Sequence, residues 1–181
     1  MVTGLIPHRY AMALYKYAME TKTGDKVYEE MKQVADSFRA NPSLEKVLSN
    51  PYVKSDDKKR ALLAAAGKNP GDDYRRFVTL IIDHRREEYA YLMALAYRDI
   101  YRKENNISQV RITTAVELPA GEMDKLRGVV ERAVKAASLE YEYTVDPSII
   151  GGFVIDIDST RMDASVSGEL EQLRLNLLRS N

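Results

Sequence analysis

The chain has 181 residues, with 27 Lys and Arg against 27 Asp and Glu, and no cysteine. The length allows one large domain or two small ones, and the lack of cysteine excludes disulfides, thiolate metal sites and cysteine nucleophiles. The charge is uneven: residues 1–105 hold 19 Lys and Arg against 15 Asp and Glu, whereas residues 106–181 hold 8 against 12. This asymmetry indicates two units with different partners, and the small basic excess of the first does not favour nucleic-acid binding.

The chain contains no apolar run near the roughly 18 residues that a membrane span needs, so we expect no direct membrane insertion. Residues 1–12 also lack the basic start and apolar block of a signal peptide.

Residues 1–105 are expected to form a bundle of six helices after a loose leader at residues 1–7. Turn and cap signals separate the helical patterns, for example Asn41-Pro42, Asn50-Pro51 and Asn69-Pro70-Gly71. The expected helices cover approximately residues 8–21, 26–40, 43–48, 57–66, 72–85 and 87–104.

The first and fifth of these helices carry more apolar surface than a bundle of this size needs. The first is either a central helix of the bundle, buried on more than one side, or a helix with one face on the bundle and another free for a partner. If the first and fifth lie side by side, they form a groove for an amphipathic partner helix. The candidate anchor residues in that groove are Tyr10, Leu14, Tyr17, Phe77, Leu80 and Ile81.

After Asn105-Asn106 the spacing of apolar residues changes from a helical pattern to a partly alternating one. Strands are expected at residues 107–116, 139–145 and 153–157, with a helix after Pro119 between the first two. A turn at residues 158–160 then leads into a helix with Val166, Leu170, Leu173 and Leu177 on one stripe. Residues 106–181 are therefore expected to form a small β-α-β-β-α domain, which makes the whole chain α+β and mostly α.

The segment Ile149-Ile150-Gly151-Gly152-Phe153-Val154-Ile155-Asp156, followed by Asp163-x-Ser165 and the leucine-striped helix, is similar to the signature of the delta subunit of F-type ATP synthase. The mitochondrial counterpart of that subunit is the oligomycin-sensitivity-conferring protein. Arg9-Tyr10-Ala11-x-Ala13-Leu14 resembles the start of the family, and the stretch from Val110 to Leu118 resembles its second most recognisable segment. Arg86, eleven residues before Tyr97, stands where the family tends to keep an arginine.

The resemblance covers nearly the whole chain and implies structural roles for Gly151, Gly152, Asp163 and Ser165. One departure is Asp158, which stands where a glycine or another small turn residue is expected.

The resemblance implies a non-catalytic stator subunit. Its helical domain would bind the N-terminal helix of an alpha subunit of the catalytic head, and its C-terminal domain would bind the b subunits of the peripheral stalk. Such a clamp resists the torque of the rotor and supports proton-coupled ATP synthesis. It would lie peripherally, on the cytoplasmic side of the cell membrane, as part of the complex.

No pattern of catalytic residues is present. Asp156, Asp158 and Asp163 could be considered as oxygen ligands for a metal, but a solvated acidic edge is the favoured interpretation. The two histidines, His8 and His84, are expected at the surface, and no serine-hydrolase, zinc-protease or phosphate-loop motif occurs. We therefore expect no catalytic residues, cofactor or metal.

The twelve tyrosines mostly follow helical spacing, which favours packing in the bundle over base stacking. The main alternative to the stator is a freestanding helical-bundle adaptor or regulatory protein of another complex, and an enzyme is the third.

Overall fold

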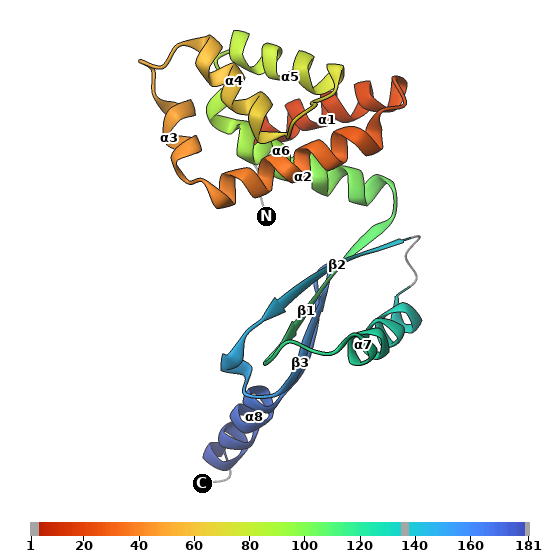
Figure 1. Ribbon diagram of the computed structural model, residues 1–181. Helices are drawn as coiled ribbons and strands as arrows, with labels where there is room; N and C mark the ends of the chain where they lie inside the picture. Colours follow the sequence, from red (N-terminus) through yellow and green to blue (C-terminus); the bar gives the residue numbers. More distant parts are fainter. Residues whose placement is uncertain (1–3, 135–137, 180–181) are drawn as a thin grey trace. The chain divides into compact units, whose positions relative to one another are not determined.

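The computed structural model describes residues 4–134 and 138–179. It is mostly helical, with one small mixed sheet of four strands. The chain divides into two compact units, Met1–Glu104 and Asn105–Asn181 (Figure 1). The expected boundary, after residue 105, differs from this division by one residue.

In its described part, the first unit consists of six α-helices and one short 3-10 helix. They are α1 (Leu5–Glu20), α2 (Gly24–Ala40), α3 (Ser43–Ser49), α4 (Ser55–Ala65), α5 (Asp72–Asp83), η1 (Glu87–Tyr89) and α6 (Ala90–Glu104). The expected leader at residues 1–7 is wrong from Leu5 onwards, because α1 begins there. Pro7 does not prevent this, since a proline is compatible with the first turn of a helix.

The centre of the first unit is α6, which packs against both α1 and α2. Its buried side chains include Met93, Ala94, Ala96 and Tyr97. Helix α1, in contrast, buries a narrow stripe and leaves the rest of its surface exposed or half-buried. The structure therefore gives the central position to α6 and not to the first helix.

Several tyrosines pack inside this unit, as their helical spacing predicts. The rings of Tyr28 and Tyr101 stack with their centroids 4.4 Å apart, and Tyr15 contacts both Tyr97 and Tyr101 edge-on.

The second unit contains a sheet with the strand order β2-β1-β3-β4. Its elements are β1 (Ile107–Thr114), α7 (Ala120–Ala133), β2 (Ser138–Val145), the 3-10 helix η2 (Pro147–Ile149), β3 (Gly152–Ile157), β4 (Thr160–Ser165) and α8 (Val166–Arg179). Strands β1 and β2 are parallel and joined through α7, whereas β1–β3 and β3–β4 are antiparallel.

The expected β-α-β-β-α order lacks one strand, β4, which lies between the predicted turn at residues 158–160 and the last helix. Its side chains are exposed except at Ser165, so it lacks the apolar alternation by which a half-buried strand is recognised.

The core of the second unit lies between the sheet and α7. Val110 and Ile112 of β1, Ile155 of β3 and Val130 of α7 are buried there. Helix α8 buries none of its residues and contacts β4 and η2. Within the described ranges, none of the helices combines the length and the apolar character that a membrane span requires.

Candidate partner-binding site

Helices α1 and α5 lie side by side and run in opposite directions. Three pairs of side chains join the two helices. Later residues of α1 pair with earlier residues of α5, as in an antiparallel arrangement. The Tyr10 hydroxyl lies 2.8 Å from Nδ1 of His84, Arg76 donates to the Tyr17 hydroxyl at 2.5 Å, and the Thr21 hydroxyl donates to Oδ2 of Asp73 at 2.7 Å.

A groove with a volume of about 360 Å³ lies between these two helices. Its lining consists of Tyr10, Ala13, Leu14, Tyr17, Asp73, Arg76, Phe77 and Leu80. Leu14 and Phe77 are buried, whereas the side chain of Leu80 is 43% exposed. The lining is thus mainly apolar, with a buried floor and an open side.

A second hollow of about 360 Å³ adjoins the first and shares Tyr10, Ala13 and Leu80 with it. Its other lining residues are Ile6, Arg9 and Arg86. We call the two hollows together the α1/α5 groove. Its extent along α1, from Ile6 to Tyr17, is about 17 Å at the rise of an α-helix, which corresponds to roughly three turns of a partner helix.

Five of the six anchor residues expected from the sequence line this groove: Tyr10, Leu14, Tyr17, Phe77 and Leu80. The sixth, Ile81, does not line it; it is 1% exposed and belongs to the core of the first unit. The expected set lacked Ile6, Ala13, Arg76 and the arginines at the far end of the groove. Ala13 had a signal in the sequence, since a small residue on an exposed helix face leaves room for a partner to approach.

The end of the groove near Asp73 is held by hydrogen bonds. The hydroxyls of Thr23 and Thr21 both donate to Oδ2 of Asp73, and these bonds hold the pKa of its carboxyl below the ordinary value. Because both threonines follow α1 and Asp73 lies in the first turn of α5, this carboxylate fixes the two helices together.

A second carboxylate, that of Glu30, lies close to the start of α5. Its Oε1 accepts a hydrogen bond from the Gly71 backbone at 2.6 Å, while its buried Oε2 has no hydrogen-bond partner among the described residues. Burial raises the pKa of Glu30, although the bond from Gly71 opposes that effect.

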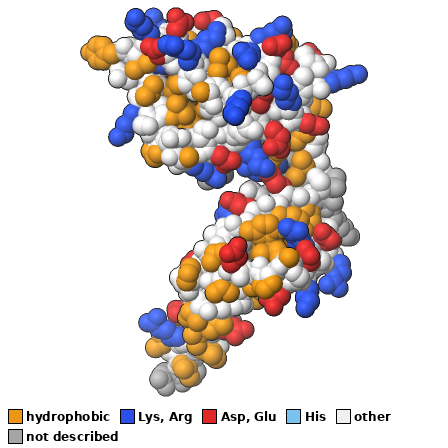
Figure 2. Space-filling view, viewed as in Figure 1, with side chains coloured by type: hydrophobic (Ala, Val, Ile, Leu, Met, Phe, Trp, Pro, Cys, Tyr) orange, Lys and Arg blue, Asp and Glu red, His pale blue; other side chains and the backbone are white. Residues whose placement is uncertain are grey.

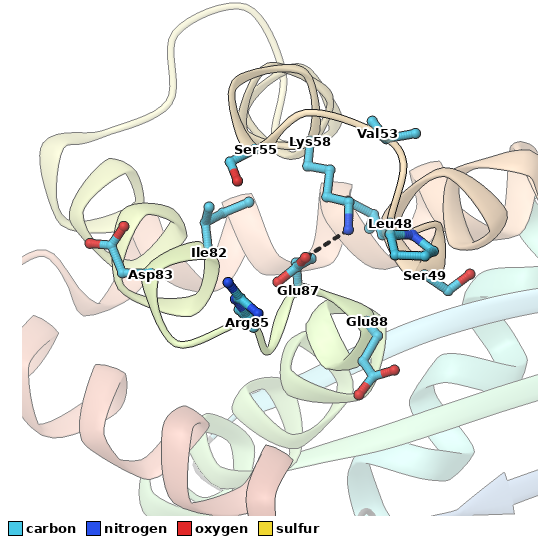
Figure 3. A pocket seen from close by; sticks show the side chains of 11 residues that line it. Leu48, Ser49, Val53, Ser55, Lys58, Ile82, Asp83, Arg85, Glu87 and Glu88 are labelled. Atoms are coloured by element: carbon cyan, nitrogen blue, oxygen red, sulfur yellow. Dashed lines mark hydrogen bonds and ion pairs between the residues drawn. The ribbon is translucent and has the colours of Figure 1, made fainter.

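Another hollow, of about 560 Å³, lies between the segment after α3, the start of α4 and η1. Figure 3 shows Lys58 of α4 pointing towards Glu87 of η1, with Nζ and Oε1 2.7 Å apart. Asp83, Arg85 and Glu88 also line it. Because most of this lining is charged or polar, it complements an apolar helix face less well than the α1/α5 groove does, and none of the expected anchors lies there.

The four motif residues of the second unit lie where β3, β4 and α8 meet. Gly152 has φ +74°, and a Cβ on it would lie 2.1 Å from the Ala164 carbonyl oxygen. Oδ1 of Asp163 accepts from the backbone and the hydroxyl of Ser165, at 2.9 and 2.6 Å. The Ser165 hydroxyl accepts in turn from the Gly168 backbone at 3.0 Å, at the first turn of α8.

Gly151 completes this junction, because its carbonyl accepts a hydrogen bond from the Val166 backbone. These hydrogen bonds join the end of β4 to the start of α8, so the four motif residues have structural contacts here.

The three aspartates considered as metal ligands have separate partners. Asp156 pairs with Arg161 at 3.2 Å, and Oδ1 of Asp158 accepts from the Gln109 backbone at 3.0 Å. Asp163 bonds to Ser165, as described above. In residues 4–134 and 138–179, no group of three or more His, Cys, Asp or Glu residues has an arrangement that could hold a metal ion.

A family model described as ATP synthase delta (OSCP) subunit matches residues 6–177. The ATP synthase subunit delta of Phocaeicola vulgatus is 35% identical over 182 residues, covering 100% of this chain and 98% of that protein. The subunit of the same name from Parabacteroides distasonis is 36% identical over 180 residues, covering 99% of both.

The fold is similar to that of one chain in a cryo-EM structure of the Toxoplasma gondii mitochondrial ATP synthase hexamer. The TM-score is 0.75 at 18% identity, and the match covers 97% of this chain and 98% of the other. At this identity the likeness concerns the fold alone.

Proposed function

The chain belongs to the ATP synthase delta (OSCP) subunit family, and from that membership we propose that it clamps the catalytic head to the peripheral stalk through its two units. It is a non-catalytic subunit of F-type ATP synthase with a stator role, so it is not an enzyme by itself. A clamp of this kind needs two separate binding surfaces and no chemistry, and it keeps the head from turning with the rotor.

The α1/α5 groove is the proposed surface for the head. The N-terminal helix of an alpha subunit is its occupant in this proposal. The observation that carries it is the apolar lining, with Leu14 and Phe77 in the floor and Leu80 on the open side. An amphipathic helix would place its apolar face in such a groove. A few aromatic and aliphatic side chains can supply most of the binding energy.

The second unit is the proposed surface for the b subunits of the stalk. Helix α8 supports this, because its leucines are unusually exposed for a helix of a folded domain: Leu170 is 53% exposed, Leu173 58% and Leu177 70%. Figure 2 shows hydrophobic side chains at the surface along this helix. Exposed apolar stripes of this kind mark interaction surfaces.

The subunit would lie peripherally, on the cytoplasmic side of the cell membrane, through its contacts in the complex. A freestanding adaptor of another complex is not favoured, because the family match extends from residue 6 to residue 177.

The test is calorimetric titration of the full chain with a peptide of the alpha-subunit N-terminus from the same organism, about twenty residues long. We expect one-to-one, submicromolar binding that Leu80→Asp abolishes. Leu80 is preferable to Leu14 or Ile81, because the latter two are buried and an aspartate there would unfold the domain.

Leu92→Asp is the matched control, since Leu92 is 36% exposed and does not line the groove. Absence of binding by the folded wild-type chain, or equal loss in both variants, would contradict the groove as the head-binding surface.

A further inference from the structure

One end of the α1/α5 groove is strongly basic. Arg9 of α1 and Arg86, which follows α5, line the same hollow beside the apolar side chains of Ile6 and Leu80. Arg9 is exposed and Arg86 is half-buried. Two arginine side chains therefore line an otherwise apolar hollow.

The backbone fixes the position of Arg86. At the end of α5 the chain reverses: Arg85 adopts φ +53°, and the Arg86 backbone N–H donates to the Ile81 carbonyl at 2.7 Å. This is the hydrogen-bonding pattern with which a helix commonly ends when a left-handed residue follows it. The base of the Arg86 side chain is thus held at the groove and does not lie on a mobile loop.

Neither arginine has a carboxylate partner among the residues that the structure describes. Other surface arginines do have one: Arg39 pairs with Asp36 and Arg111 with Glu142. At the opposite end of the groove, Arg76 lies near a negative charge, that of Asp73, and donates to Tyr17. The two ends therefore differ in charge, with two cations at one end and a balanced pair at the other.

We infer that the helix bound in the groove carries an acidic side chain at the end that lies over Arg9 and Arg86. The inference rests on the proposed function of the groove and adds the chemistry of its partner at one end. A carboxylate can accept two parallel hydrogen bonds from one guanidinium, which gives geometric specificity as well as attraction. The distance along α1 from Arg9 to Tyr17 is about 12 Å, so the acidic residue lies about two turns from the side chain that packs beside Tyr17.

This contact fixes the register of the partner helix. An apolar groove alone would tolerate a shift by one turn, because the apolar stripe repeats every three or four residues. A carboxylate held at one end does not allow such a shift without losing its ion pair.

The test uses the full chain and the alpha-subunit peptide described above. Replacing both Arg9 and Arg86 with Gln is expected to weaken binding roughly 5- to 20-fold at low ionic strength, as for two partly exposed ion pairs. The difference should shrink as salt is added, because salt screens exposed charges. The matched control is Arg39→Gln with Arg60→Gln, which removes the same charge from the same unit away from the groove.

A charge exchange identifies the partner residue. Arg9→Glu with Arg86→Glu should lose binding of the native peptide, and a peptide with one acidic residue changed to Lys should recover it.

Leu80→Asp separates the two proposals. If it abolishes binding while the Gln variant binds like wild type, the groove is correct and the inference is wrong. A peptide without any acidic residue that binds normally also overturns the inference. If the wild-type chain does not bind at all, the proposed function fails and the inference fails with it.

Discussion

The backbone of Gly152 passes so close to Ala164 that a β-carbon on residue 152 would lie 2.1 Å from the Ala164 carbonyl oxygen. Its φ of +74° is also one that side-chain-bearing residues rarely adopt. Because the two residues belong to paired strands, β3 and β4, a clash here would separate these strands. The neighbouring Gly151 is less constrained, since a β-carbon there would lie 3.2 Å from Cγ2 of Val166.

We therefore predict that Gly152→Ala destabilises the second unit by roughly 3 kcal/mol or more, because strain in φ and the backbone clash act together. The measurement is amide hydrogen exchange in β1 and β3, which reports on this unit separately from the first. Gly128→Ala in α7 is the control. Apart from the neighbouring backbone of α7 itself, no atom of the described residues lies within 4 Å of a β-carbon added there, so this change should stabilise the unit by about 0.5 to 1 kcal/mol. Equal protection in Gly152→Ala and wild type would contradict the proposed structural role of this glycine.

The spacing of apolar residues in the sequence predicts only some of the residues that line the groove. The spacing of Tyr10, Leu14 and Tyr17 identified one face of α1, and the three residues line the groove. Helix α5 has a wide apolar arc, and periodicity does not tell which half of it faces the core. For this reason Ile81 was expected in the groove although it is 1% exposed, whereas Leu80 beside it does line the groove.

In the second unit, the sequence pattern does not predict one strand or the geometry of the turn before it. Strand β4 has no apolar alternation, because it is an edge strand with exposed side chains. Its pairing with β3 comes from the strand ladder and the ion pair between Asp156 and Arg161, and neither leaves an apolar pattern in the sequence. The turn between β3 and β4 has a backbone conformation that explains why a glycine is expected at position 158. Asp158 has φ +50°, a conformation that glycine adopts freely and aspartate tolerates. Its side chain also bonds to Gln109, a contact over 49 residues that no local pattern contains.

A second prediction concerns Asp73, whose hydrogen bonds from Thr23 and Thr21 hold its pKa below the ordinary value of 3.8. A lowered pKa means that the folded state favours the carboxylate, so these bonds stabilise the protein above about pH 4 and are lost as the pH falls through the lowered pKa. Asp73→Asn should therefore reduce stability by about 1 kcal/mol at neutral pH, and the difference from wild type should disappear in acid.

Urea unfolding followed by circular dichroism over a series of pH values measures this difference. Asp72→Asn is the control, because Asp72 is exposed in the same turn of α5. If the two variants have the same stability at neutral pH, the threonine bonds do not join α1 to α5 as described.

The opposite dependence on pH is predicted for Glu30. Burial raises its pKa above 4.5, so the folded state favours the protonated form. The stability that Glu30 contributes is then greatest in acid and falls as the pH rises through 4.5 towards the raised value. Glu30→Gln keeps an oxygen that can accept from Gly71 and removes the buried charge, so this variant should be more stable than wild type at neutral pH and about equal in acid.

Glu29→Gln supplies the comparison, since Glu29 is the adjacent residue of α2 and is exposed. The same urea series measures both variants. A loss of stability in Glu30→Gln at neutral pH would mean that the attraction of Lys26 and Arg75 for the carboxylate outweighs its burial.

The last prediction concerns α8 and the proposed contact with the stalk. Leu173 and Leu177 lie one turn apart and are 58% and 70% exposed, so replacing both with Asp should leave the stability of the chain nearly unchanged. If their stripe packs on a b-subunit helix, the same change places two charges in an apolar interface and should weaken binding to the b subunits at least 100-fold. Co-purification with the b subunits, together with a melting curve of each variant, measures both effects.

Gln172→Asp is the matched change on the same helix, because it adds a charge at an exposed residue outside that stripe. The two units are proposed to bind different partners, so the Leu173 and Leu177 variant should still bind the alpha-subunit peptide with unchanged affinity. If this variant retains the b subunits, the stalk-binding surface lies on another face of the second unit. If it loses both partners, its fold has been disturbed, and the exposure of α8 does not mark an independent interface.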